Sequence, residues 1–71
     1  MVGLVTEIRD DSSFVTANST VLTDDDTLFF NQFGVQVQDA EIEKNEAVLI
    51  NGVANSNGEV VADSVVLLDR Q

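Results

Sequence analysis

Hydrophobic and polar residues alternate most clearly over the last third of the chain, between residues 46 and 68. Val48 and Ile50 share one face of an extended chain, because successive side chains of a strand point to opposite faces. Val60 and Ala62 repeat this spacing on a second run rich in β-branched residues. The pattern therefore predicts two long strands that fold back on each other and organise the rest of the domain.

The dipeptide Asn57-Gly58 separates these two runs and favours a two-residue type I′ turn. Both central positions of that turn need a positive φ, which Gly adopts freely and Asn tolerates better than other residues. A hairpin closed in this way fixes which residues oppose each other. The predicted pairs are Ser56 with Glu59, Ala54 with Val61, and Ile50 with Val65.

Two odd steps interrupt the alternation of apolar residues. An odd step turns every later side chain to the other face, unless a β-bulge absorbs one residue. We therefore predict a bulge wherever two apolar residues on one strand are three positions apart. The two predicted bulges lie at Asp63-Ser64, between Ala62 and Val65, and near Thr6-Glu7, between Val5 and Ile8.

The first two thirds of the chain contain shorter extended runs, separated by clusters of Asp, Asn and Ser. Such residues favour turns because their side chains hydrogen-bond to nearby backbone groups. The expected elements are strands at residues 2–9, 14–18 and 20–23, a turn at 10–13, an extended buried segment at 27–30, a short strand or edge at 35–38, one helical turn at 39–42 capped by Asp39, a turn at Lys44-Asn45, and a fraying polar tail at 69–71.

Three short strands, an irregular connection and two long bent strands match a known order of elements. We predict an all-β domain, a small five-stranded OB-like Greek-key barrel with a short helical turn or irregular segment between strands three and four. A small antiparallel β-sandwich and an SH3-like barrel are the alternatives. The 71 residues suffice for one domain, whether native in length or excised from a longer protein.

The charge is strongly one-sided, because 13 acidic residues face only Arg9, Lys44 and Arg70, giving a net charge of −10 at pH 7. This balance repels polyanions and provides no basic face for nucleic acid. No run approaches the roughly 20 apolar residues that cross a bilayer, so no membrane span is expected. The N-terminal run begins as a strand and shows no signal-peptide core.

The chain has neither His nor Cys, the residues most often used for acid–base, nucleophilic and metal chemistry. Its serines have no His to activate them as nucleophiles, which leaves a Ser–Lys pair through Lys44 as the remaining route to a nucleophilic serine. Asp24, Asp25 and Asp26 read as a solvated turn, with weak cation binding as the alternative. Asp63 is the acid expected to be partly buried, in a structural role. We therefore predict no catalytic residue, no metal ligand and no cofactor.

The four Phe residues offer the other candidate surface. Phe14 and Phe29 are expected in the core, whereas at least one of Phe30 and Phe33 should face outward. An exposed Phe marks either a stacking platform for single-stranded nucleic acid or a protein contact. The net charge of −10 argues against the first. The predicted interaction surface comprises Phe30, Phe33, Val35 and Val37, together with an unpaired strand edge.

Three groups of residues carry a family resemblance: Thr27-Leu28-Phe29, the run Asn45-Glu46-x-Val48-x-Ile50-x-Gly52, and Gly58-x-Val60-x-Ala62-x-x-Val65. Together they resemble a bacterial domain family of unknown function. The resemblance covers residues 3–67 and implies an OB-like barrel that occurs as tandem modules in exported proteins. Asn45 stands where the family has Gly, and Asn also accepts a left-handed turn. No site residue follows from the resemblance.

These observations predict a non-enzymatic structural or interaction module that binds a protein partner or a neighbouring domain. Binding of single-stranded nucleic acid and weak cation binding are the alternative functions. If the resemblance holds, the setting is a larger, exported bacterial protein.

Overall fold

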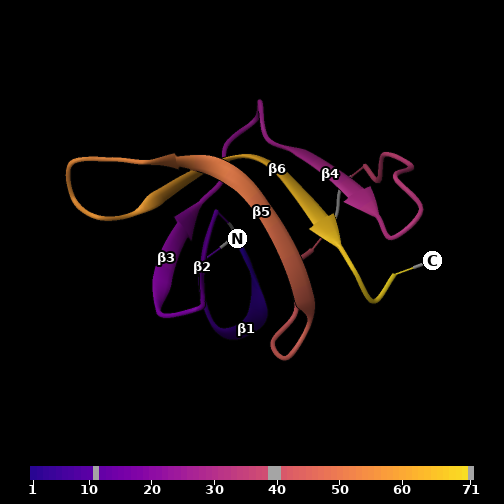
Figure 1. Ribbon diagram of the computed structural model, residues 1–71, viewed down its shortest axis with the longest axis horizontal. Coiled ribbons are helices and arrows are strands. Elements are labelled where there is room, and N and C mark those ends of the chain that lie inside the picture. Colours follow the sequence, from indigo (N-terminus) through magenta and orange to yellow (C-terminus); the bar gives the residue numbers. More distant parts are fainter. Residues whose placement is uncertain (11, 39–40, 71) are drawn as a thin grey trace.

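The computed structural model describes residues 1–10, 12–38 and 41–70, which form a single sheet of six strands (Figure 1). No helix occurs in these described residues. The strands are β1 (Val2–Asp10), β2 (Ser13–Thr16), β3 (Ser19–Leu22), β4 (Leu28–Asn31), β5 (Ala47–Ala54) and β6 (Val60–Leu67). The order of the strands in the sheet is β3-β2-β1-β5-β6-β4.

Five of these strands close into a barrel, as predicted. Closure comes from the parallel pairing of β3 with β6, in which Val21 opposes Val60 and Leu22 opposes Val61. The segment expected to be extended becomes β4, an extra strand that lies parallel to β6 on its other side. The fold is thus a closed five-stranded barrel with one added strand, consistent with a small OB-like barrel.

Both predicted bulges are confirmed. In the β5–β6 ladder Asn51 opposes Ser64 and Gly52 opposes Ala62, so Asp63 is the extra residue. In the β1–β2 ladder Val5 opposes Thr16 and Glu7 opposes Val15, so Thr6 is extra. The bulge at Thr6 does not bring Ile8 inside, since 41% of Ile8 remains exposed. These extra residues bend the long strands around the barrel.

The tip of the β5–β6 hairpin differs from the prediction. Only Gly58 has a positive φ, of 78°, so Asn57-Gly58 is not a type I′ turn. The side chain of Asn55 instead accepts hydrogen bonds from the N–H groups of Asn57 (2.9 Å) and Glu59 (3.0 Å). Asn55 therefore pairs with Glu59 across a three-residue loop, residues 56–58. As a result Ala54 opposes Val60, not Val61. The bulge at Asp63 then restores the predicted pairing of Ile50 with Val65.

Positive φ at both central positions of a two-residue turn occurs instead between β2 and β3. Ala17 has a φ of 50° and Asn18 a φ of 62°, as a type I′ turn requires. A non-Gly residue in this region costs about 1 kcal/mol, and Ala gains no local hydrogen bond in return. We expect Ala17→Asn combined with Asn18→Gly to stabilise the domain by about 1 kcal/mol, measurable in urea unfolding. An unchanged midpoint would show that this turn carries no strain.

The connection between β4 and β5 is irregular, as expected. The predicted short strand at 35–38 is reduced to a single bridge between Phe30 and Gln36. Of the predicted helical turn, Asp39 and Ala40 lie outside the described residues, and residues 41–43 have no helical structure. The predicted turn before β5 is confirmed, and Asn45 has a φ of 71°.

The predicted turn after β1 is likewise held by a side chain. The N–H of Ser12 and the hydroxyl of Ser13 donate to Asp10 Oδ1, at 2.8 and 3.0 Å. These bonds lower the pKa of Asp10, and the backbone N–H of Ser12 contributes most. Asp11, the remaining member of the predicted turn, lies outside the described residues.

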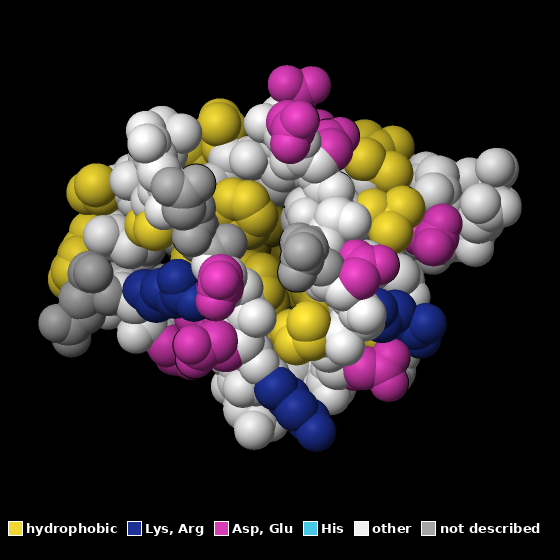
Figure 2. Space-filling model, turned by 180° about the vertical axis from the view of Figure 1, so that it is seen from behind, with side chains coloured by type: hydrophobic (Ala, Val, Ile, Leu, Met, Phe, Trp, Pro, Cys, Tyr) yellow, Lys and Arg dark blue, Asp and Glu magenta, His cyan; other side chains and the backbone are white. Residues whose placement is uncertain are grey.

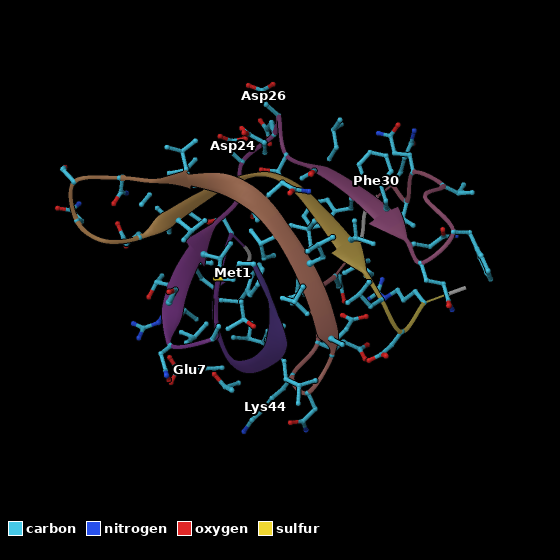
Figure 3. The ribbon with its side chains drawn as sticks, viewed as in Figure 1. Met1, Glu7, Asp24, Asp26, Phe30 and Lys44 are labelled. Carbon is cyan, nitrogen blue, oxygen red and sulfur yellow. The ribbon has the colours of Figure 1, made fainter. Side chains whose placement is uncertain are left out.

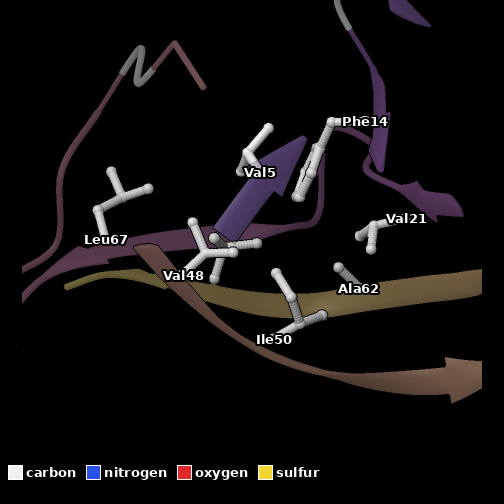
Figure 4. Close-up of a cluster of buried hydrophobic side chains, with 8 residues drawn as sticks. Val5, Phe14, Val21, Val48, Ile50, Ala62 and Leu67 are labelled. Carbon is white, nitrogen blue, oxygen red and sulfur yellow. The ribbon is translucent and has the colours of Figure 1, made fainter. Parts of the chain in front are cut away.

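The core fills the barrel with side chains from all five of its strands (Figure 4). Val48, Ile50 and Val65 are buried as predicted, and Val60 is half-buried against them. Phe14 is buried and Phe29 packs on the core from β4. The buried hydrophobic residues are Val5, Phe14, Val21, Val48, Ile50, Ala62, Val65 and Leu67.

Candidate interaction surface

The four residues of the predicted interaction surface lie on β4 and the loop after it. Phe33 and Val35 are 71% and 60% exposed, whereas Phe30 and Val37 are half-buried. Asn31 Oδ1 shapes the loop by accepting from the N–H groups of Phe33 (2.9 Å) and Val35 (3.1 Å). The expectation that Phe30 or Phe33 faces outward is thus confirmed. The phenyl ring of Phe33 projects into solvent from a turn that the side chain of Asn31 holds with two hydrogen bonds.

The strand edge expected beside these residues is covered, so this part of the prediction was wrong. The N–H of Asn31 donates to Val35 O at 2.9 Å, and the N–H of Val37 donates to Phe29 O at 2.7 Å. These two bonds flank the bridge between Phe30 and Gln36. The loop folds back and satisfies the outer edge of β4, which leaves apolar side chains as the main feature of this surface.

Phe30 is the last member of an apolar row that crosses four strands on the outside of the barrel. Val2 of β1 opposes Leu49 of β5, Leu49 opposes Val66 of β6, and Val66 opposes Phe30. Their sequence neighbours Val48 and Val65 are buried, so alternation turns the row outward. Figure 1 shows β5 crossing the molecule between β1 on one side and β6 and β4 on the other.

Two exposed aliphatic residues flank this outer row, Leu4 on β1 and Leu28 on β4, which are 56% and 45% exposed. Within the row Val2 is 63% exposed, while Leu49 and Val66 are half-buried between neighbouring strands. A solvated antiparallel face would alternate apolar-in with polar-out, and this sheet does not. The sequence carries the signal in its unbroken apolar runs, VLI at 48–50 and VVLL at 65–68. Alternation was used only to place the inward-facing residues of these runs, so their outward-facing members, Leu49 and Val66, were not predicted as a surface.

The buried acid is Glu46, not Asp63, which is exposed at its bulge. Glu46 is 8% exposed and accepts from Arg70 Nε at 2.7 Å, while the N–H of Glu43 donates to its Oε1 at 3.2 Å. Arg70 also donates to the carbonyl of Glu41. The predicted fraying of the tail is therefore wrong for Arg70. The pair ties the end of the chain to the start of β5, a structural role.

The side chain of Asp69 also holds the tail, by accepting from the N–H of Ala47 at 3.0 Å. Gln71, the last residue of the predicted tail, lies outside the described residues. Sequence reasoning missed both anchors of the tail, because their partners are more than 20 positions away.

The acidic loop before β4 is organised as a turn. Asp24 Oδ1 accepts from the N–H of Asp26 at 2.9 Å. The hydroxyl of buried Thr27 accepts from the N–H of Asp24 at 3.0 Å and donates to Ala62 O at 2.9 Å. Figure 3 shows Asp24 and Asp26 projecting from this loop. No group of acidic side chains in the described residues is arranged to hold a metal ion.

Basic side chains are scattered, and most contact acids. Arg9 Nε lies 3.1 Å from Glu7 Oε2 in an exposed pair, and Arg70 is taken up by Glu46. On the face drawn in Figure 2 the Lys and Arg side chains stand apart from one another. Two of the three basic residues are thus partly neutralised, and no basic groove forms among the described residues.

Comparison of the chain with protein-family models, with curated proteins and with solved structures gives no match. None of the described residues belongs to a helix that is long and apolar enough to span a membrane. An interpretation of function therefore depends on the chemistry of the surface itself. The apolar outer row and the exposed Phe33 in the loop after β4 are the most distinctive parts of that surface.

Proposed function

We propose that this chain is a non-enzymatic protein-interaction module, and that a partner protein or neighbouring domain covers the outer face of β1, β5, β6 and β4. The row Val2, Leu49, Val66 and Phe30 supports this proposal most directly. A contiguous exposed apolar patch is typical of an interaction site. The family resemblance adds the proposal that the module works as an OB-like domain of a larger, exported bacterial protein.

The energetics favour a covering partner. Fully burying an exposed Val, Leu or Phe side chain gains about 1.5–3 kcal/mol. A partner that covers the row would gain much of that at Val2, which is 63% exposed, and a smaller part at each of the half-buried residues Leu49, Val66 and Phe30. Phe33, at 71% exposure in the loop after β4, provides an exposed aromatic side chain near the end of the strand that carries Phe30. Rigid strands lose little entropy when a partner covers them.

Affinity capture from cell extract and exported fractions tests the proposal, with quantitative mass spectrometry as the readout. The test variant combines Leu49→Thr with Val66→Thr, which keeps strand propensity but places hydroxyls in the row. The matched control is Ile8→Thr, another exposed aliphatic residue on β1 beyond the bulge. We expect a partner that wild type and control retain equally and that the test variant retains at least about tenfold less.

Equal retention by the row variant would contradict the proposal, as would the absence of any partner in every fraction. Far-ultraviolet circular dichroism and urea unfolding show whether the row variant remains folded. A gel shift with a single-stranded oligonucleotide at ~50 mM salt tests the alternative function, because electrostatic binding is strongest at low salt. We expect no retardation, whereas a shifted band would favour nucleic acid as the ligand.

A further inference from the structure

Two Asn-Gly dipeptides lie close together in the chain, Asn51-Gly52 and Asn57-Gly58. An asparagine before glycine is prone to spontaneous loss of its side-chain amide, because glycine has no side chain to obstruct attack by its backbone nitrogen. The other four asparagines precede Ser, Gln or Glu. Both dipeptides are exposed, so access of water does not distinguish them. Their backbone surroundings do.

The first dipeptide is held by a strand ladder. Asn51 and Gly52 lie within β5 and pair with β6. Asn51 Nδ2 donates to Ser64 Oγ at 3.2 Å. A β-carbon at Gly52 would lie 2.2 Å from Val61 O, so the backbones of β5 and β6 are in close contact here. For the Gly52 nitrogen to reach Asn51 Cγ, the chain must rotate out of the extended conformation, which breaks the ladder to β6.

The second dipeptide lies in the loop between β5 and β6, which projects from the barrel in Figure 1. The N–H of Asn57 donates to Asn55 Oδ1 at 2.9 Å, and the N–H of Gly58 donates to Asn55 O at 3.1 Å. Apart from the adjoining residues, nothing in the described part of the chain lies within 4 Å of a β-carbon placed on Gly58. Opening this tip breaks only turn bonds, since the β5–β6 ladder starts at Ala54 and Val60.

We propose that Asn57 is a site of spontaneous deamidation and backbone isomerisation in the folded protein, whereas the β5–β6 ladder protects Asn51. The backbone nitrogen of Gly58 gives its proton to hydroxide and forms a bond to Asn57 Cγ. The bond from Cγ to Nδ2 then breaks, and Nδ2 leaves as ammonia with a proton taken from water. Water opens the resulting five-membered imide at one of its two carbonyls, which gives aspartate or isoaspartate at position 57.

The products change the charge and the geometry of the hairpin tip. Either one adds a negative charge to a chain whose net charge is −10. Isoaspartate also places the former Asn57 Cβ in the main chain, which lengthens the backbone by one atom and should weaken the bonds that Asn55 accepts from Gly58 and Glu59. The barrel should stay folded, because none of its core residues lies in this loop. The apolar row lies outside the loop too, so this proposal and the proposed function can fail separately.

Peptide mapping of protein kept for weeks in warm, mildly alkaline buffer tests the proposal. Cleavage after Glu46 and Glu59 releases one peptide, residues 47–59, that contains both dipeptides. Tandem mass spectrometry then measures the acid formed at each asparagine. In the folded protein we expect Asn57 to convert at least about tenfold faster than Asn51. In concentrated urea, where no ladder protects either site, the two should convert at comparable rates.

Gly58→Ala is the matched variant, because its methyl group obstructs the attack on Asn57. It should slow conversion at position 57 by about tenfold or more and leave Asn51 unchanged. Equal rates at the two asparagines of the folded protein would overturn the proposal. So would a folded protein that keeps Asn57 intact while the sample in urea converts it, or undiminished conversion at position 57 in Gly58→Ala. Circular dichroism checks that the variant is folded.

Discussion

Gly52→Ala is expected to unfold the domain or to remove most of its stability. A β-carbon at this position would lie 2.2 Å from the carbonyl oxygen of Val61 and 2.9 Å from the Cα of Ala62. Both obstacles are backbone atoms, so no side-chain rotation relieves the contact. Here β6 is held between β3 and β5, because Val61 pairs with Leu22 as well as with Val53. The long hairpin depends on glycine at this crossing.

We expect Gly52→Ala to cost at least about 3 kcal/mol, measured by urea unfolding. Stability of roughly 0.05–0.15 kcal/mol per residue leaves little margin in a chain of 71 residues. Gly58→Ala is the control, since it has a φ of +78° but nothing within 4 Å of its β-carbon. That change should cost only about 1 kcal/mol. Equal effects at both sites would refute the steric explanation.

Arg70→Met should destabilise the protein by about 2–4 kcal/mol, because it leaves the buried carboxylate of Glu46 without its cation. Glu46 would keep the N–H of Glu43 as a donor but lose Arg70 Nε at 2.7 Å and Nη2 at 3.3 Å. The control is Arg9→Met, whose pair with Glu7 is 54% and 57% exposed. An exposed pair of this kind contributes about 0–1 kcal/mol.

A double-mutant cycle separates the ion pair from the packing of the Arg70 side chain. Glu46→Gln combined with Arg70→Met should recover part of the loss caused by Arg70→Met alone, because no charge then stays buried. Urea unfolding of the four proteins provides the coupling energy. Additive effects of the two changes would mean that the pair contributes nothing specific, and that the tail is held by its other bonds.

The sequence predicts those structural features that depend on a single strand. Odd spacing of apolar residues located the bulges at Thr6 and Asp63, because alternation must be repaired within the strand itself. Period-two spacing likewise placed Val48, Ile50 and Val65 inside. The type I′ turn predicted at Asn57-Gly58 was wrong, because the side chain of Asn55 accepts hydrogen bonds from the N–H groups of Asn57 and Glu59 and so forms a different loop.

The tertiary structure decided every feature that depends on distant partners. The parallel pairings of β6 with β3 and β4 join segments more than 30 residues apart, and no short-range pattern encodes them. The parallel pairing of β4 with β6 adds Phe30 to the apolar outer row, and the β5–β6 ladder brings Arg70 to Glu46. The sequence alone therefore determined the strands, the bulges and the inward faces, because these follow from alternation within each strand. Only barrel closure decided which side chains share an outward face and which distant residues meet, because it depends on how all the strands pack together.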